Sequence, residues 1–156
     1  MTQSRVPTIS AYAIVQRPLD DRFLIIEKVV RGSMMFDLPG GIRNIGEKLL
    51  QTVVRTVAED AMIRLSPTNY IGFGYHIYDG VAGRVCNLRS TFCGTPEDAI
   101  LVSDGMRAVA PVHWMNLPEL VANTRRVLCQ DSIRCLREYI GGIRLPLDRC
   151  GEVDDQ

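Results

Sequence analysis

Two short apolar segments lie near the start of the chain, separated by a polar break. Residues 6–15 include the run TISAYAIV, and residues 23–30 are FLIIEKVV. Runs of this length that are rich in β-branched residues and bounded by turn residues are typical of strands. Pro18, Asp20 and Asp21 lie between them, and such residues favour a tight turn. We therefore expect the two segments to form a β-hairpin.

A helical pattern follows. Apolar residues recur at three- and four-residue intervals and give one face that packs on a sheet; they are Leu50, Val53, Val54, Val57 and Ala61. Thr56, Glu59 and Asp60 are three and four residues apart, so their side chains share a different face of the same helix. That second face is expected to look toward the segment containing Gly40 and Gly41.

The second half of the chain mixes strands and helices. Ser66-Pro67 interrupts the first helix, and strands are expected at residues 70–78 and 84–93, joined near Asp79-Gly80. A short strand is expected at residues 109–114, where Pro111 restricts it to an edge or a bulge. Helical patterns follow at residues 117–122 and 125–139. Mixed elements with hairpins among the strands indicate an α/β fold with a mixed β-sheet covered by helices.

Composition narrows the classes of protein. A chain of 156 residues fits one domain, which we assign to residues 1–148, with an acidic and flexible tail at 149–156. Basic and acidic residues balance at 18 each, so no net field favours nucleic acid or an anionic membrane. No apolar run approaches the roughly 20 residues that span a bilayer, and MTQSRVPTIS has no apolar signal core. Five scattered cysteines without ligand spacing indicate free thiols in the cytoplasm rather than a zinc site.

The segment from Leu38 to Ile63, LPGGIRNIGEKLLQTVVRTVAEDAMI, carries the most specific pattern. Its spacing resembles the Nudix box, GG-x5-E-x7-RE-U-x-EE-x-G-U, where U is a bulky apolar residue. The matching positions are Gly40, Gly41, Glu47, Arg55, Val57, Glu59 and Ile63. Three positions depart from the pattern: Thr56 and Asp60 stand where the family has glutamate, and Met62 stands where it has glycine. The resemblance implies a Nudix-type α/β/α sandwich.

The resemblance also implies a metal-dependent reaction. Carboxylates on the helix bind a hard divalent cation, Mg²⁺ or Mn²⁺, which also contacts substrate phosphates. Glu59 and Asp60 are the expected metal ligands, with Glu47 as an outer ligand or a partner of Arg55, whose role is to orient carboxylates. Gly40 and Gly41 would shape the phosphate loop. Arg43, like Arg84 and Arg89, is a candidate for phosphate contact, because a guanidinium suits bidentate phosphate recognition.

The general base is left open by the sequence. Thr56 replaces the glutamate of the family, and a hydroxyl is not a useful base at neutral pH. The segment TPEDAILVSDG offers three acids as substitutes, each of which is more often a simple loop residue: Glu97, Asp98 and Asp104. His76 and His113 lack ligand-spaced partners and are interpreted as structural strand residues. Aromatic residues in the strands are interpreted as core rather than as a stacking surface; they are Phe73, Tyr75, Tyr78 and Trp114.

Together these features predict a MutT-like Nudix hydrolase. Residues 7–148 resemble a small bacterial Nudix phosphatase subfamily, which implies cleavage of a phosphoanhydride in a nucleoside di- or triphosphate or a similar pyrophosphate. The expected partner is a small nucleotide-like molecule, without nucleic acid or membrane, and the resemblance suggests a homodimer. The alternative is a catalytically impaired Nudix-fold module that binds a nucleotide without cleaving it, which Thr56 favours.

Overall fold

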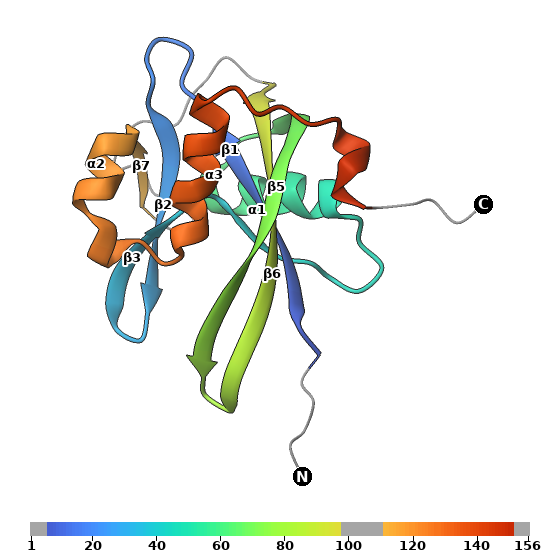
Figure 1. Cartoon of the computed structure of the whole chain (residues 1–156), viewed down its shortest axis with the longest axis vertical. Coiled ribbons are helices and arrows are strands. Elements are labelled where there is room, and N and C mark those ends of the chain that lie inside the picture. Colours follow the sequence, from blue (N-terminus) through green and yellow to red (C-terminus); the bar gives the residue numbers. More distant parts are fainter. Residues whose placement is uncertain (1–5, 98–110, 152–156) are drawn as a thin grey trace.

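The strands are divided between two sheets in the computed structural model, which describes residues 6–97 and 111–151 (Figure 1). The first sheet has the order β4–β1–β6–β5, and the second has the order β3–β2–β7. The strand bounds are β1 (Thr8–Val15), β2 (Phe23–Val30), β3 (Ser33–Asp37), β4 (Gly40–Ile42), β5 (Leu65–Gly80), β6 (Gly83–Pro96) and β7 (Val112–Met115). The first sheet is mixed, because β1 runs parallel to β6 while the β1–β4 and β5–β6 pairs are antiparallel. The predicted α/β architecture with a mixed sheet is confirmed.

The predicted hairpin between residues 6–15 and 23–30 is wrong. The turn forms, since Arg17 N–H donates to the Arg22 carbonyl at 2.8 Å. The two segments are nevertheless paired only by a single β-bridge between Gln16 and Phe23. Beyond it, β1 pairs with β4 on one edge and with β6 on the other. Both edges of β1 are therefore occupied, and β2 pairs with β3 and β7 instead.

Helices cover both faces of the mixed sheet. The helix bounds are α1 (Leu49–Ala61), α2 (Leu117–Ala122) and α3 (Gln130–Ile140), with short 3-10 segments η1 (Thr124–Arg126) and η2 (Leu147–Cys150). Ala11 and Ala13 of β1 lie in a core cluster with Val53 and Val57 of α1. The intervening Tyr12 and Ile14 lie in a second cluster with α3. The side-chain alternation of one strand thus places α1 and α3 on opposite faces.

Several boundaries differ from the predicted ones. The helix α1 ends at Ala61, before Ser66 and Pro67, but β5 begins at Leu65 rather than at residue 70 and accommodates Pro67 beside a register shift. The last helix begins at Gln130 rather than at residue 125. The segment η2 extends to Cys150 and packs on the core, two residues past the expected domain end at 148. No helix among residues 6–97 and 111–151 combines the length and apolar character that crossing a bilayer requires.

Candidate functional site

The paired glycines lie in a strand rather than in a turn. Gly40 pairs with Tyr12 and Gly41 with Ala11 across the β4–β1 ladder. Gly40 has φ of 153°, and a Cβ at this position would lie 2.3 Å from the carbonyl oxygen of Ala11. At Gly41 a Cβ would lie 3.1 Å from Cγ2 of Thr56. The glycines are therefore required for close packing of β4 between β1 and α1.

Arg55 joins two of the predicted site acids. Its Nε and Nη2 donate to the two carboxylate oxygens of Glu47 at 2.7 and 2.9 Å. Its Nη1 donates to Glu59 at 3.1 and 3.3 Å, and Nη2 also donates to the Ile42 carbonyl at 3.0 Å. A planar guanidinium with a fixed fork of donors fixes the orientation of both carboxylates.

Glu47 is held in its ionised form. Hydrogen bonding from Arg55 lowers the pKa of Glu47 to about 2, and the Asn44 N–H and Thr52 hydroxyl act in the same direction. The same contacts raise the pKa of Arg55 above its ordinary value. Glu47 therefore carries a full negative charge at any physiological pH.

Asp60 lies in a different environment from its neighbour Glu59. Its Oδ2 accepts the Gly40 N–H at 3.1 Å and lies 3.8 Å from the Lys28 ammonium. Burial raises the pKa of Asp60, and Glu59 adds to this rise, while Lys28 and the Gly40 N–H oppose it. The side chain of Asp60 is 21% exposed, whereas that of Glu59 is 58% exposed. Two adjacent acids thus present one partly buried and one solvated carboxylate.

Thr56 offers no free hydroxyl to the site. Its Oγ1 donates to the Thr52 carbonyl at 2.8 Å, one helical turn back, and the residue is buried. Its methyl group faces Gly41. The third departure from the box, Met62, caps α1 with φ of 57°, a left-handed conformation in which glycine carries no steric cost.

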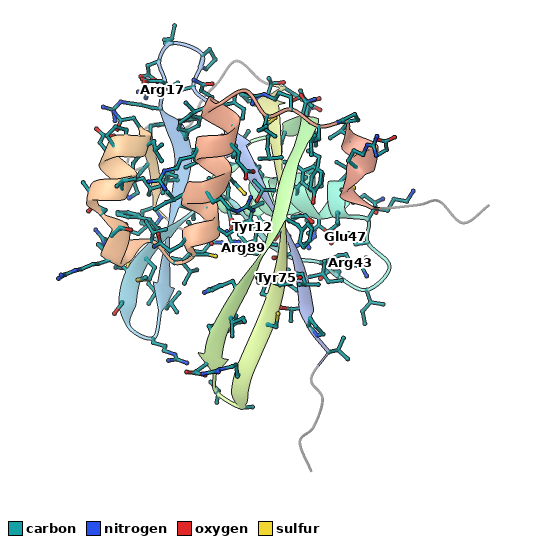
Figure 2. The ribbon with its side chains drawn as sticks, viewed as in Figure 1. Tyr12, Arg17, Arg43, Glu47, Tyr75 and Arg89 are labelled. Atoms are coloured by element: carbon teal, nitrogen blue, oxygen red, sulfur yellow. The ribbon has the colours of Figure 1, made fainter. Side chains whose placement is uncertain are left out.

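Of the other candidate acids, only Glu97 lies in the described part of the chain. Glu97 is exposed and lies 3.7 Å from Arg64. Asp98 and Asp104 lie outside the described residues. Arg43 is exposed in the segment that leads from β4 to Glu47, and both residues are labelled in Figure 2. Across residues 6–97 and 111–151, no group of three or more His, Cys, Asp or Glu side chains is arranged to hold a metal ion.

Arg89 belongs to a buried ion pair with Asp37. Its Nη1 and Nη2 donate to the two oxygens of Asp37 at 2.9 and 2.8 Å, and Nη2 also donates to Ser132 at 2.8 Å. The guanidinium lies 3.6 Å from the ring centre of Tyr12, and the two residues overlap at the centre of Figure 2. Both terminal nitrogens of Arg89 are thus bonded within the protein, and the hypothesis of a phosphate contact by Arg89 stays a prediction. Arg84 pairs with Asp79 at 3.4 Å in the β5–β6 hairpin.

A cavity of about 380 Å³ opens beside the glycine strand. It lies next to the Gly40–Asp60 contact, because Tyr12 and Ile42 line it and Lys28 lies over the Tyr12 ring. The residues lining it are Tyr12, Val30, Arg31, Ile42, His76, Tyr78, Asp79, Asn87, Arg89 and Leu128. A larger but more open depression of about 790 Å³ is lined by Glu47 and Arg55 at the start of α1. A volume of 380 Å³ suits a small ligand.

His76 and several aromatic side chains of β5 lie in surroundings other than those predicted. His76 lines the cavity, and its ring centre lies 5.0 Å from that of Tyr78 with the two planes tilted by 37°. Burial together with the Arg89 charge lowers the pKa of His76. No periodicity in the sequence signals this position. Phe73, Tyr75 and Tyr78 are exposed on β5 rather than buried in the core, whereas Trp114 is buried as expected. His113 contacts Glu27 at 3.2 Å, which fits its predicted structural role.

Comparison with known proteins identifies similar chains. No family model matches the sequence. The phosphatase NudJ of Escherichia coli K12 is 24% identical over 137 residues, which cover 86% of this chain and 86% of that protein. The corresponding protein of Shigella flexneri matches to the same extent.

Solved structures extend the similarity to three dimensions. A Nudix hydrolase from Nitrosomonas europaea has a TM-score of 0.78 at 23% identity and covers 97% of this chain and 100% of its own. A MutT Nudix hydrolase from Burkholderia pseudomallei has a TM-score of 0.67 at 19% identity, with 86% and 98% covered. The dihydroneopterin triphosphate pyrophosphohydrolase of E. coli has a TM-score of 0.67 at 15% identity, with 89% and 100% covered. The chain therefore has the fold of the Nudix hydrolases, and its solved structural neighbours are Nudix and MutT hydrolases.

Proposed function

We propose that this protein is a metal-dependent Nudix hydrolase that cleaves a phosphoanhydride in a small nucleotide-like di- or triphosphate. The observation that carries the proposal is the network of Glu47, Arg55 and Glu59 beside Asp60 and the glycine strand. These side chains occupy box positions and lie alongside β4, where Asp60 contacts Gly40 and Arg55 contacts Ile42. The similarity to a phosphatase and to one pyrophosphohydrolase supports the same class of reaction.

The donor set fits a magnesium or manganese ion. Glu59 and Asp60 are adjacent oxygen donors, and Mg²⁺ in proteins is held by one or two carboxylates with the remaining positions taken by water and substrate phosphate. Burial is the main cause of the raised pKa of Asp60, and a cation bound there would favour the ionised carboxylate. We assign Glu59 and Asp60 as ligands and Glu47 as the outer carboxylate. When bound, such an ion neutralises phosphate oxygens and lowers the pKa of its water.

The protein groups have separate roles in this proposal. Arg55 holds Glu47 and Glu59 in fixed orientations, which lowers the entropic cost of assembling the site. The Gly40 N–H fixes the Asp60 carboxylate. Gly40, Gly41 and Arg43 would face the phosphates, and the neighbouring cavity of about 380 Å³ would take the remainder of a small substrate.

A second candidate function is a nucleotide-binding module without hydrolysis. It is favoured by Thr56, whose hydroxyl is bonded to the helix backbone and supplies no base. Fold does not separate the two functions, because catalysis depends on the residues of the site.

An activity assay with Glu59→Gln tests the proposal. Purified protein is incubated with nucleoside triphosphates, nucleotide sugars and dinucleotides plus Mg²⁺ or Mn²⁺, and phosphate or pyrophosphate release is measured. We expect Glu59→Gln to lower kcat/KM by at least about 100-fold. Glu138→Gln on α3 removes a comparable surface acid that pairs with Arg134 and serves as the control.

The outcomes separate the candidates. Hydrolysis at the wild-type rate by Glu59→Gln would refute the assigned site. Thermal stabilisation by a nucleotide without turnover would favour the binding module, since a ligand of the native state raises stability by mass action.

The expected location and assembly complete the proposal. The five cysteines, all in described segments, are free thiols, which agrees with a reducing cytoplasm. Phe73, Tyr75 and Ile77 form an exposed apolar strip on β5 that supports a homodimer.

A further inference from the structure

Lys28 is a charged residue of the site that the box pattern does not contain. It lies on β2, where it pairs with Met35 of β3. Its Nζ donates to the Gly40 carbonyl at 3.1 Å, lies 3.8 Å from Asp60 Oδ2 and is 5.5 Å from the ring centre of Tyr12. The ammonium is therefore surrounded by a carbonyl oxygen, a carboxylate oxygen and an aromatic face, each of which attracts a cation.

Glu27, the residue before Lys28 on β2, does not face Asp60. Glu27 contacts Arg126 and His113 on the other side of β2, as the alternation of side chains along a strand requires. Lys28 is only 25% exposed, and its charge also lowers the pKa of the buried Asp37. It thus lies between the buried core charge and the carboxylate of Asp60.

The two oxygens that hold the ammonium are of the type that Mg²⁺ and Mn²⁺ prefer. A divalent ion on Asp60 would come within a few ångströms of the Lys28 charge, and like charges at this distance repel strongly where water is partly excluded. We propose that Lys28 is a tethered counter-ion of Asp60 that a divalent metal has to displace, so that Lys28 sets the metal affinity of the site. This inference rests on the proposed function in its use of Asp60 as a metal ligand.

Displacement of Lys28 by a metal ion changes where its charge acts. Without metal, the ammonium lies 3.8 Å from the Asp60 carboxylate oxygen and partly balances its charge. With metal, the long side chain of Lys28 moves away from Asp60 and toward the cavity beside Tyr12, where its charge is available to an anionic substrate.

Manganese binding to the metal-free protein tests the inference without any substrate. Free Mn²⁺ is measured by electron paramagnetic resonance during titration of wild type, Lys28→Met and Lys28→Arg. We expect Lys28→Met to bind Mn²⁺ about tenfold more tightly than wild type, because the competing charge is gone. Lys28→Arg keeps the charge and is expected to stay near the wild-type affinity.

Two controls fix the interpretation. Arg84→Met removes the same unit charge at the exposed hairpin pair with Asp79 and is expected to leave the Mn²⁺ affinity unchanged. In the Asp60→Asn background, Lys28→Met is expected to lose its effect, since the two residues then no longer compete for a carboxylate. An Mn²⁺ affinity of Lys28→Met equal to or weaker than that of wild type would overturn the inference.

Lysine labelling gives a second test on the unaltered protein. The chain contains two lysines, Lys28 and Lys48, so limited acetylation followed by mass spectrometry reports each separately. Saturating Mn²⁺ is expected to raise the labelling rate of Lys28 at least about threefold relative to Lys48, because displacement exposes the amine. An unchanged or lower ratio would contradict the proposal.

Failure of the inference is distinguishable from failure of the proposed function. Tighter Mn²⁺ binding by Lys28→Met with no hydrolysis of any substrate would support the counter-ion and reject the hydrolase. Turnover that depends on Glu59, together with unchanged Mn²⁺ affinity in Lys28→Met, would reject the counter-ion alone.

Discussion

Two arginine–carboxylate pairs of this protein have similar geometry and opposite surroundings. The buried cluster, defined as Asp37, Arg89 and Ser132, contains a bidentate fork with both charged side chains at most 1% exposed. The surface cluster, defined as Glu47, Arg55 and Glu59, contains a similar fork in which Arg55 is 29% exposed. The carboxylate of Asp37 accepts hydrogen bonds from Arg89, Ser132 and the Leu38 N–H.

The difference shows that burial, rather than residue type, decides whether a charged side chain stabilises the fold or is open to a ligand. The buried cluster has satisfied its carboxylate within the protein and excludes water, so it stabilises the packing of β3, β6 and α3. The surface cluster leaves Glu59 open to solvent, where a cation or a phosphate can reach it. Removing one partner is expected to unfold the first region and to impair the chemistry of the second.

The largest effect is expected for Asp37→Ala. It leaves the Arg89 guanidinium buried without its counter-charge, which should lower the free energy of unfolding by roughly 3–5 kcal/mol. Urea denaturation followed by circular dichroism measures the change. The matched control is Asp79→Ala, which breaks an Asp–Arg pair whose side chains are 68% and 76% exposed and should cost less than about 1 kcal/mol. Equal losses in the two variants would contradict the comparison.

The Asp37–Arg89 pair also predicts that the free energy of unfolding depends on pH. Burial alone would raise the pKa of Asp37, but the Arg89 charge and hydrogen bonds outweigh it and hold that pKa below its ordinary value of 3.8. A lowered folded-state pKa contributes stability above the ordinary value, and this contribution is lost as the pH falls through the folded-state pKa. Wild type should therefore lose more free energy of unfolding below pH 3.8 than Asp37→Asn, and parallel profiles for the two proteins would argue against it.

An effect of intermediate size is expected for Arg55→Met, on metal binding and turnover rather than on folding. Glu47 and Glu59 lose their common donor, so the pKa of Glu47 should rise from about 2 toward its ordinary 4.5. We expect Mn²⁺ affinity or turnover to fall about 10- to 100-fold with little change in melting temperature. Carboxylate NMR of Glu47 reports the pKa independently of activity. Arg134→Met, which breaks pairs with Asp131 and Glu138 on α3, is the control and should leave Mn²⁺ binding unaltered.

The smallest effect is expected for Thr56→Val. The variant keeps the shape of the side chain beside Gly41 and removes a hydroxyl that is bonded to the Thr52 carbonyl. Turnover and Mn²⁺ affinity should stay within about twofold of wild type, because this hydroxyl does not reach the metal face. A loss of tenfold or more in either quantity would show that Thr56 takes part in the chemistry.

Much of the local structure followed from the sequence. The three- and four-residue spacing from Leu50 to Ala61 predicted α1, which begins at Leu49 and ends at Ala61. The segments FLIIEKVV and TISAYAIV predicted strands with nearly the observed bounds. The box predicted that Arg55 would orient carboxylates, which agrees with its hydrogen bonds to Glu47 and Glu59. These features depend on neighbours in sequence, which a linear pattern contains.

Tertiary structure decided the rest. The sequence did not show that β1 and β2 separate into different sheets, that Arg89 pairs with Asp37, or that His76 lines a cavity. It also did not show that Lys28 of β2 reaches Asp60 of α1. Each of these contacts joins residues far apart in the chain, and its charge and burial are set only when strands and helices pack. By itself the sequence determined the fold class and the helical face of the acids, whereas packing determined which charges stay open to a ligand, because desolvation depends on the surrounding elements.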